Sequence, residues 1–213
     1  SILSDPYDTI QFDEALDRVI DGRVEAMGAD GRLMPAPSGE VYQVNLAEKI
    51  LVTLLSKIAN FIPDTGIWMN TQRPEWNDAN NALVGTGVSV VTLCYLHRFL
   101  NKAVPLFSEL DQDSVQLSAE VAAFMSDVAS ALEAHQGSIG KGPVSDAVRK
   151  EVMEALGTAA ERYRQGIYDR GFSASKKSVS LASVVDCLSR ARDISAVSIR
   201  SNRLKDGLYH AYN

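Results

Sequence analysis

Little in this sequence points to a specific chemistry, and what it lacks excludes several classes of protein. It has only two cysteines and three widely separated histidines, which give neither a disulfide framework nor the spacing of metal ligands. Serine-nucleophile, phosphate-loop, zinc and helix-turn-helix signatures are absent as well. We therefore expect no metal and no cofactor. Cys94 and Cys187 lie in apolar helical patterns and are predicted to be reduced core residues, as in a cytoplasmic protein.

The charge balance and the apolar runs exclude two further classes of partner. The net charge of −6 argues against binding to a nucleic-acid backbone. The longest apolar run, residues 83–96, is interrupted by polar residues and is shorter than the roughly 20 residues that a membrane span requires. With 46% hydrophobic and 23% charged residues, the composition is that of a globular protein, and we expect a single helical domain over residues 1–213.

Apolar residues recur at helical spacing along most of the chain, whereas the strand signals, such as residues 67–69, are too short to build a sheet. The spacing predicts helices over residues 13–23, 45–61, 80–101, 113–135, 144–169 and 178–199. The helix at 80–101 is apolar on nearly every side and is predicted to be the most buried, packed closely through Gly85 and Ser89. Asn45 is predicted to cap the preceding helix, with Glu48 completing a capping box. These patterns predict an all-α fold of antiparallel helix hairpins.

Residues 66–87 differ in composition from the rest of the chain. They include both tryptophans, two carboxylates, an arginine and four asparagines, a mixture that a plain connecting loop rarely needs. Flat aromatic faces stack on sugar rings, amides and arginine bind hydroxyl groups, and a carboxyl group can protonate a glycosidic oxygen. The mixture therefore indicates a sugar-binding cleft. Its candidate substrate-binding residues are Trp68, Arg73, Trp76, Asn77 and Asn80.

The two carboxylates, Asp78 and Glu75, are the candidate catalytic residues. Apolar neighbours and a second carboxylate both raise the pKa of a carboxyl group, so Asp78 is a candidate general acid that Glu75 orients or tunes. Each carboxylate also has a structural interpretation, because Asp78 can cap the helix that follows it and Glu75 can pair with Arg73. The two tryptophans, similarly, can be buried anchors rather than sugar platforms.

Two other polar stretches are candidates for the same cleft. One flanks a proline-rich loop at residues 35–37 and either lines the cleft or is solvated; its residues are Arg32, Glu40, Tyr42 and Gln43. The other, residues 200–210, either completes a pocket or forms an exposed tail; it includes Asn202, Arg203, Tyr209 and His210. Gly85 and Gly87 do not form a dinucleotide fingerprint, since no strand signal precedes them, and close packing explains them better.

Residues 75–78, Glu-Trp-Asn-Asp, resemble the acidic-Trp-Asn-Asp motif of cellobiose and chitobiose phosphorylases, which have an (α/α)6 toroid of the six-hairpin glycosidase type. The resemblance implies that Asp78 is the general acid and that Trp76 stacks on a sugar. The order of helix, motif and small-residue helix over residues 45–100 also resembles one hairpin of such a toroid. Because too few helices are predicted for a whole toroid and no methionine precedes Ser1, we expect a part of a longer protein.

The sequence therefore predicts a carbohydrate-active domain that cleaves a glycoside with a carboxylic general acid. A phosphorylase would use phosphate as the nucleophile, whereas a hydrolase needs a second carboxylate, at about 5–5.5 Å if retaining or roughly 6.5–9.5 Å if inverting. The predicted partners are an oligosaccharide or glycoside, phosphate and the remaining parts of a larger chain, but neither nucleic acid nor a membrane. The alternative is a non-catalytic helical domain, for binding or assembly, in which the tryptophan-containing segment is structural.

Overall fold

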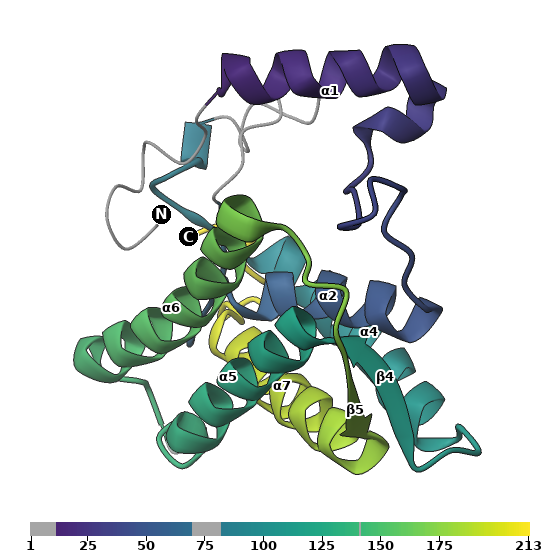
Figure 1. The fold of residues 1–213 in the computed structure, drawn as a ribbon. Coiled ribbons are helices and arrows are strands. Elements are labelled where there is room, and N and C mark those ends of the chain that lie inside the picture. Colours follow the sequence, from purple (N-terminus) through teal and green to yellow (C-terminus); the bar gives the residue numbers. More distant parts are fainter. Residues whose placement is uncertain (1–11, 70–81, 141) are drawn as a thin grey trace.

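The computed structural model describes residues 12–69, 82–140 and 142–213, and helices dominate it (Figure 1). Its helices include α1 (Glu14–Met27), the 3-10 helix η1 (Gly28–Arg32), α2 (Leu46–Ile58), α4 (Val90–Ser108), α5 (Ala119–Gln136), α6 (Asp146–Arg170) and α7 (Leu181–Ser201). Its strands include β1 (Phe61–Ile62), β2 (Gly66–Trp68), β3 (Val88–Ser89), β4 (Ser114–Ser118) and β5 (Lys176–Ser180).

The prediction of an all-α fold of helix hairpins, as part of an (α/α) toroid, is wrong. Helix makes up 62% of the structure, but two small antiparallel sheets accompany it. In one sheet β2 lies between β1 and β3, and in the other β4 pairs with β5. The fold is therefore a helix-rich mixture of α and β structure.

The β4–β5 sheet occupies positions where the apolar spacing predicted the starts of two helices. In β4, Val115 and Leu117 are buried while Gln116 between them is exposed, which is the alternation of a half-buried strand. The strand leads directly into α5, and Val115 also fits the helical spacing of the apolar residues in α5. The sequence therefore predicted one continuous helix from residue 113. The partner strand is distant in sequence, with Ser114 opposite Ser180, and no local pattern reveals such a pairing.

Asn45 caps α2 as predicted, since its side-chain oxygen accepts a hydrogen bond from the backbone N–H of Glu48 at 2.8 Å. The predicted capping box is not formed, however. The Glu48 carboxylate turns into the protein instead and accepts a hydrogen bond from the backbone N–H of Ser118. The residue types at a helix start thus identified the cap but not the direction of the acidic side chain.

The helix predicted over residues 80–101 begins later and is less buried than expected. α4 starts at Val90, where the Ser89 hydroxyl accepts a hydrogen bond from the N–H of Thr92 at 3.0 Å. Gly85 lies before the helix, with a left-handed φ of 75°. One face of α4 is exposed, and it includes Cys94, so the prediction that Cys94 is a core residue is wrong. Cys187 is buried as predicted, and both thiols are free.

The core lies between the helices, with α4 packed on α7, α5 packed on α6, and α5 also in contact with α7 and α2. Its large, fully buried side chains include Leu51, Leu93, Phe107, Leu156 and Leu188. α1 adds no buried residue to this core and lies apart from the other long helices (Figure 1). None of the helices within the described ranges is long and apolar enough to cross a membrane.

The close approach of β2 to β3 gives a test of this packing at Gly66. A Cβ atom at Gly66 would lie 2.8 Å from the carbonyl oxygen of Ser89 and 3.0 Å from its carbonyl carbon. Gly66→Ala should therefore lower the free energy of unfolding by about 1–3 kcal/mol, as overpacking does elsewhere, when measured by urea denaturation.

The control is Gly22→Ala in α1, where nothing lies within 4 Å of the added carbon. Alanine is the better helix former by roughly 0.5–1 kcal/mol, so this variant should be neutral or more stable. Equal effects of the two substitutions would contradict the close packing of β2 on β3.

Candidate functional site

Most of the candidate residues predicted from sequence lie outside the described part of the structure. These are Arg73, Glu75, Trp76, Asn77, Asp78 and Asn80, all within residues 70–81. Trp68 is described: it ends β2, is partly buried, and its indole N–H is buried without a hydrogen-bond partner among the described residues. What the structure describes of the candidate site is therefore Trp68 and the residues on both sides of the segment.

The residues that precede and follow segment 70–81 lie side by side. The N–H of Met69 donates to the carbonyl of Gly87 at 3.1 Å, and the N–H of Gly85 donates to the carbonyl of Met69 at 2.9 Å. Trp68 pairs with Val88 in the β2–β3 ladder. Gly87 is closely packed, as expected, because a Cβ there would lie 3.0 Å from the carbonyl oxygen of Asn213. The Leu83 side chain lies as close, at 3.1 Å, so Gly87 packs against both the C-terminal backbone and the turn before it.

The C-terminal residues extend the same sheet. The N–H of Val88 donates to the carbonyl of Asn213 at 2.8 Å, and the N–H of Asn213 donates back to Val88 at 3.1 Å. The N–H of Val90 donates to the carbonyl of Ala211 at 2.9 Å. Residues 211–213 are therefore not a free tail. They bring the polar residues just before them, Tyr209 and His210, to the end of the molecule that carries Trp68.

A buried amide, Asn202, joins the C-terminal segment to the turn between β1 and β2. The Asn202 side chain is 3% exposed, and its Nδ2 donates to the carbonyls of Asp64, Thr65 and Ser198 at 3.1, 3.0 and 2.8 Å. Its Oδ1 accepts a hydrogen bond from the side chain of Asn213 at 2.6 Å. One side chain therefore holds the end of α7, the β1–β2 turn and the C-terminus together.

Asp64 lies on the other side of this network. Its φ of 61° is in the left-handed region, which aspartate tolerates better than most residues. Its carboxylate accepts hydrogen bonds from the N–H of Val144 at 2.7 Å and the hydroxyl of Ser201 at 2.9 Å. Its own N–H donates to the hydroxyl of Ser198 at 3.0 Å. The β1–β2 turn that leads to Trp68 is thus fixed to α7 and to Val144, two residues before the start of α6.

The N-cap of α4 is Ser89, whereas the cap predicted at Asp78, like the start of the helical turn at residues 82 and 83, lies outside the described residues. The prediction that Tyr42 lines the same cleft can be tested. Tyr42 precedes α2, whereas β1 and Trp68 follow it, and the 13 residues of α2 span about 20 Å. The Tyr42 side chain contacts β4 and β5, so it does not line a cleft with Trp68.

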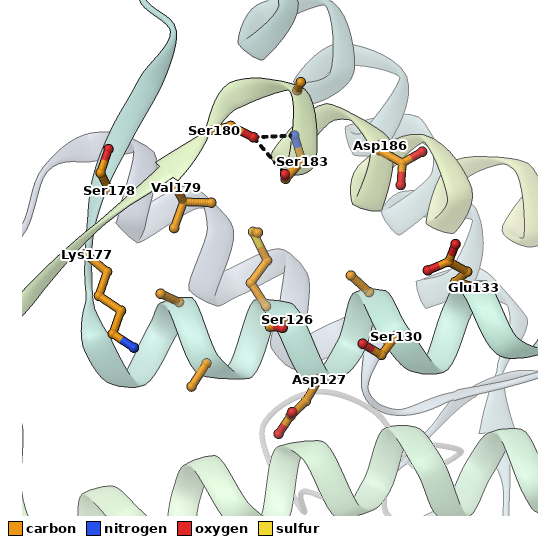
Figure 2. A pocket seen from close by; sticks show the side chains of 15 residues that line it. Ser126, Asp127, Ser130, Glu133, Lys177, Ser178, Val179, Ser180, Ser183 and Asp186 are labelled. Atoms are coloured by element: carbon orange, nitrogen blue, oxygen red, sulfur yellow. Dashed lines mark hydrogen bonds between the residues drawn. The ribbon is translucent and has the colours of Figure 1, made fainter.

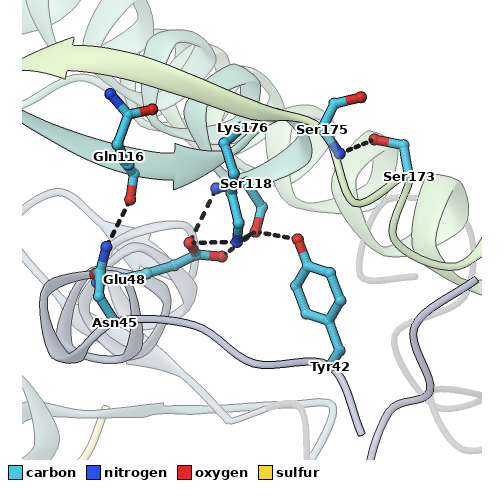
Figure 3. Close-up of polar contacts among 8 residues, drawn as sticks. All are labelled: Tyr42, Asn45, Glu48, Gln116, Ser118, Ser173, Ser175 and Lys176. Carbon is cyan, nitrogen blue, oxygen red and sulfur yellow. Dashed lines mark hydrogen bonds and ion pairs between the residues drawn. The ribbon is translucent and has the colours of Figure 1, made fainter. Parts of the chain in front are cut away.

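Tyr42 belongs instead to a second polar cluster, around a buried carboxylate (Figure 3). The Glu48 side chain accepts hydrogen bonds from both the N–H and the hydroxyl of Ser118, and Lys176 Nζ lies 3.5 Å from it. The Tyr42 hydroxyl is 2.8 Å from the Ser118 hydroxyl. Lys176 lies 4.7 Å above the centre of the Tyr42 ring, whose other contact is a stack on Phe172.

The charges in this cluster stabilise one another. Burial alone would lower the pKa of Lys176. Interactions with Tyr42 and with the Glu48 carboxylate outweigh this effect, so the pKa is raised and the ammonium form is favoured. Burial, together with the carboxylates of Glu48 and Glu120, raises the pKa of Tyr163 to about 12. Ser118 is fully buried, and its contacts with Glu48 anchor α2 to the β4–β5 sheet.

A groove of about 920 Å³ lies between α5, β5 and α7, and small residues such as Ser126, Ser130 and Ser183 line it (Figure 2). No aromatic side chain is among its lining residues. Its three carboxylates all lie beside arginines: Asp127 pairs with Arg162 at 2.6 Å, Asp186 with Arg190 at 2.8 Å, and Glu133 lies 3.8 Å from Arg190. The groove thus lacks both the aromatic platform and the free carboxyl group that cleavage of a glycoside needs.

The sequence matches no protein-family model and no curated protein. Within the residues that the structure describes, no group of three or more His, Cys, Asp or Glu side chains is arranged to hold a metal ion. Residues 66–87 and the framework around Trp68 are therefore the features of this protein that point to a function.

The Asn202 network can be tested by removing its amide. Asn202→Ala leaves three carbonyl oxygens without this donor, and each buried unpaired group costs about 1–3 kcal/mol. We expect the free energy of unfolding to fall by at least about 2 kcal/mol, and hydrogen exchange at the amides of Val88 and Val90 to accelerate. Asn101→Ala, at an exposed amide on α4, should change stability by less than about 0.5 kcal/mol. Unchanged protection at Val88 would show that Asn202 does not hold the C-terminal strand.

The Glu48 cluster can be tested by removing its charge. Glu48→Gln places an NH2 group where the carboxylate now accepts hydrogen bonds and leaves Lys176 without its counter-ion. Breaking a buried pair in this way typically costs about 3–5 kcal/mol, which urea denaturation would measure. Glu151→Gln, at an exposed position on α6, is the matched control and should have little effect. If both variants were as stable as the parent, the cluster would not anchor β4 to α2.

Proposed function

We propose that the chain is a carbohydrate-active domain in which Asp78 protonates a glycosidic oxygen. The chemistry of residues 66–87 supports this proposal, because they combine aromatic rings, amides, an arginine and two carboxylates in a single short segment. The framework around the segment supports it as well. The residues on both sides of segment 70–81 are held together by the β2–β3 ladder, and residues 211–213 are hydrogen-bonded to Val88 and Val90 beside it.

Trp68 is the observation that carries the proposal within the described residues. Its ring is only partly buried, although it lies in the middle strand of a packed sheet. Its indole N–H is closed to solvent, so the part of the side chain that is exposed is available for stacking on a sugar rather than for a hydrogen bond to one.

Phosphorolysis needs one proton donor and one nucleophile, whereas hydrolysis also needs a second carboxylate. Asp78 gives its proton to the leaving glycosidic oxygen as the bond from that oxygen to C1 breaks, and a phosphate oxygen attacks C1. In hydrolysis, the second carboxylate takes the proton of the water that attacks C1, or itself forms the glycosyl-enzyme bond that water then cleaves. The products are a sugar phosphate or a free sugar, and a saccharide shortened by one unit. Glu75 orients Asp78, while Arg73, Asn77 and Asn80 bind hydroxyl groups, and Trp76 stacks on the ring.

A second candidate function is a non-catalytic domain for binding or assembly. The observation that favours it is the apolar surface that α1 and α4 leave uncovered, with side chains such as Leu16 and Tyr95 exposed. Large exposed apolar side chains on two helices are typical of surfaces that contact another protein. This function and carbohydrate cleavage do not exclude each other, because α1 and the exposed face of α4 are distinct from Trp68 and its sheet.

The catalytic proposal is tested with Asp78→Asn. Asparagine has a similar size but no transferable proton, so turnover should fall by at least about 10²-fold, the low end for general acid catalysis. Urea denaturation should show nearly unchanged stability. The probes are cello-oligosaccharides and chito-oligosaccharides, each with and without inorganic phosphate, with reducing sugar and sugar phosphate as the measured products.

The control for Asp78→Asn is Asp111→Asn, an exposed carboxylate beyond the far end of α4 from Trp68. It should leave turnover unchanged. An Asp78→Asn protein that cleaves its saccharide at the parent rate would contradict the role of Asp78. A parent protein that neither cleaves nor binds any of these saccharides would contradict the function itself. Binding is followed by the fluorescence of Trp68 and Trp76, the only tryptophans in the chain.

A further inference from the structure

The outward face of α4 is apolar and uncovered. Val91, Tyr95, Phe99 and Leu106 follow one another at helical spacing and are all exposed, Tyr95 by 66% and Leu106 by 51%. Arg98 and Lys102 lie on the same side of the helix, and neither has an ion-pair partner among the described residues. No acidic residue occurs in α4. The face is therefore a hydrophobic stripe with two unpaired positive charges.

α1 has the complementary character. Phe12, just before it, and Leu16, Val19 and Met27 within it are exposed at helical spacing, and no residue of α1 is buried. The helix is acidic, with four carboxylates against two arginines. One arginine, Arg18, is already paired with Glu14 at 3.1 Å. The helix thus offers an apolar stripe with excess negative charge.

The dimensions of the two faces also match. The 14 residues of α1 span about 21 Å, and the stripe from Val91 to Leu106 on α4 spans about 22 Å at the same rise of 1.5 Å per residue. Packing one stripe on the other would remove both from water and bring the carboxylates of α1 close to Arg98 and Lys102. We propose that the outward face of α4 docks α1 of a second copy of this chain.

The connection between α1 and α2 favours a second copy over docking within one chain. It contains an antiparallel bridge between Pro35 and Val41 and is fixed to the body through Tyr42, which contacts Ser118, and Asn45, which donates to the carbonyl of Gln116 at 2.7 Å. α1 consequently lies apart from the body (Figure 1). In a symmetric dimer the contact is made twice, which doubles the buried area towards the roughly 1,200–2,000 Å² of stable interfaces.

The test uses one charged substitution on each side of the contact. Leu16→Asp alters only the α1 stripe and Phe99→Asp alters only the α4 stripe, and both side chains are exposed, so the fold should be retained. Sedimentation equilibrium over a wide range of concentration should show a dimer for the parent chain. Each variant should raise the dissociation constant of the dimer by at least about tenfold, because a carboxylate would be buried against an apolar stripe. The control is Leu46→Asp, at another exposed leucine, which lies at the start of α2 where an acidic residue is favourable. It should leave the dissociation constant unchanged.

Mixing the two variants distinguishes this contact from any other dimer. The Leu16→Asp copy has an intact α4 and the Phe99→Asp copy has an intact α1, so the mixture regains one of the two contacts and should dimerise more tightly than either variant alone. If circular dichroism shows that a variant has lost helix, Val19→Asp and Tyr95→Asp replace it at positions that are more exposed. A parent chain that stays monomeric, variants that dimerise like the parent, or a mixture that gains nothing would each overturn the proposal.

Discussion

The end of the molecule that carries Trp68 depends on one buried amide. Asn202 is almost inaccessible to water, yet it makes hydrogen bonds to two residues of the β1–β2 turn, to α7 and to the C-terminal residue. Because a buried amide is costly unless its partners are present, these segments are stable only in this arrangement. Asp64 is part of the same hydrogen-bond network. Its backbone is left-handed, and its carboxylate accepts hydrogen bonds from Val144 and Ser201. The position of Trp68 follows from this network.

The Glu48 cluster, at the other end of α2, is likewise a buried polar side chain that joins separate segments of the chain. It joins the start of α2 to both strands of the β4–β5 sheet, as the Asn202 network joins β1 and β2 to α7. Between the two clusters the core is apolar, with Leu51, Leu54 and Leu55 of α2 fully buried. Hydrophobic packing therefore holds the helices together, while the two polar networks specify where the irregular segments attach. The only described candidate for sugar binding, Trp68, lies on one of these attached segments.

Local sequence patterns predicted the parts of this fold that local interactions determine. Helical spacing and the cap at Asn45 could be recognised because both depend on residues within one or two turns. The β4–β5 pairing could not be recognised in this way, because it joins strands that are far apart in the sequence, with Ser114 opposite Ser180. Burial of α4 was overestimated for a related reason: an apolar residue such as Tyr95 has the same appearance in the sequence whether its face is covered or not. The Glu48 carboxylate, interpreted from sequence as part of a cap, is buried because Ser118 and Lys176 lie opposite it in the fold. Of the residues predicted for the site from the composition of residues 66–87, Trp68 is the one within the described part of the structure, and its place in a sheet next to residues 211–213 depends on residues far away in the sequence.

The most direct test of this account uses the indole group of Trp68. The chain has two tryptophans, so the nitrogen–proton correlation spectrum of labelled protein contains two indole signals, and Trp68→Phe assigns them. Titration with a cello-oligosaccharide or chito-oligosaccharide should shift the Trp68 indole signal in a saturable manner, because a sugar stacked on the exposed part of the side chain changes the environment of the ring, and Asn202→Ala should weaken this binding. A Trp68 indole signal that does not move with any of these saccharides would contradict the claim that this end of the molecule is a sugar-binding site.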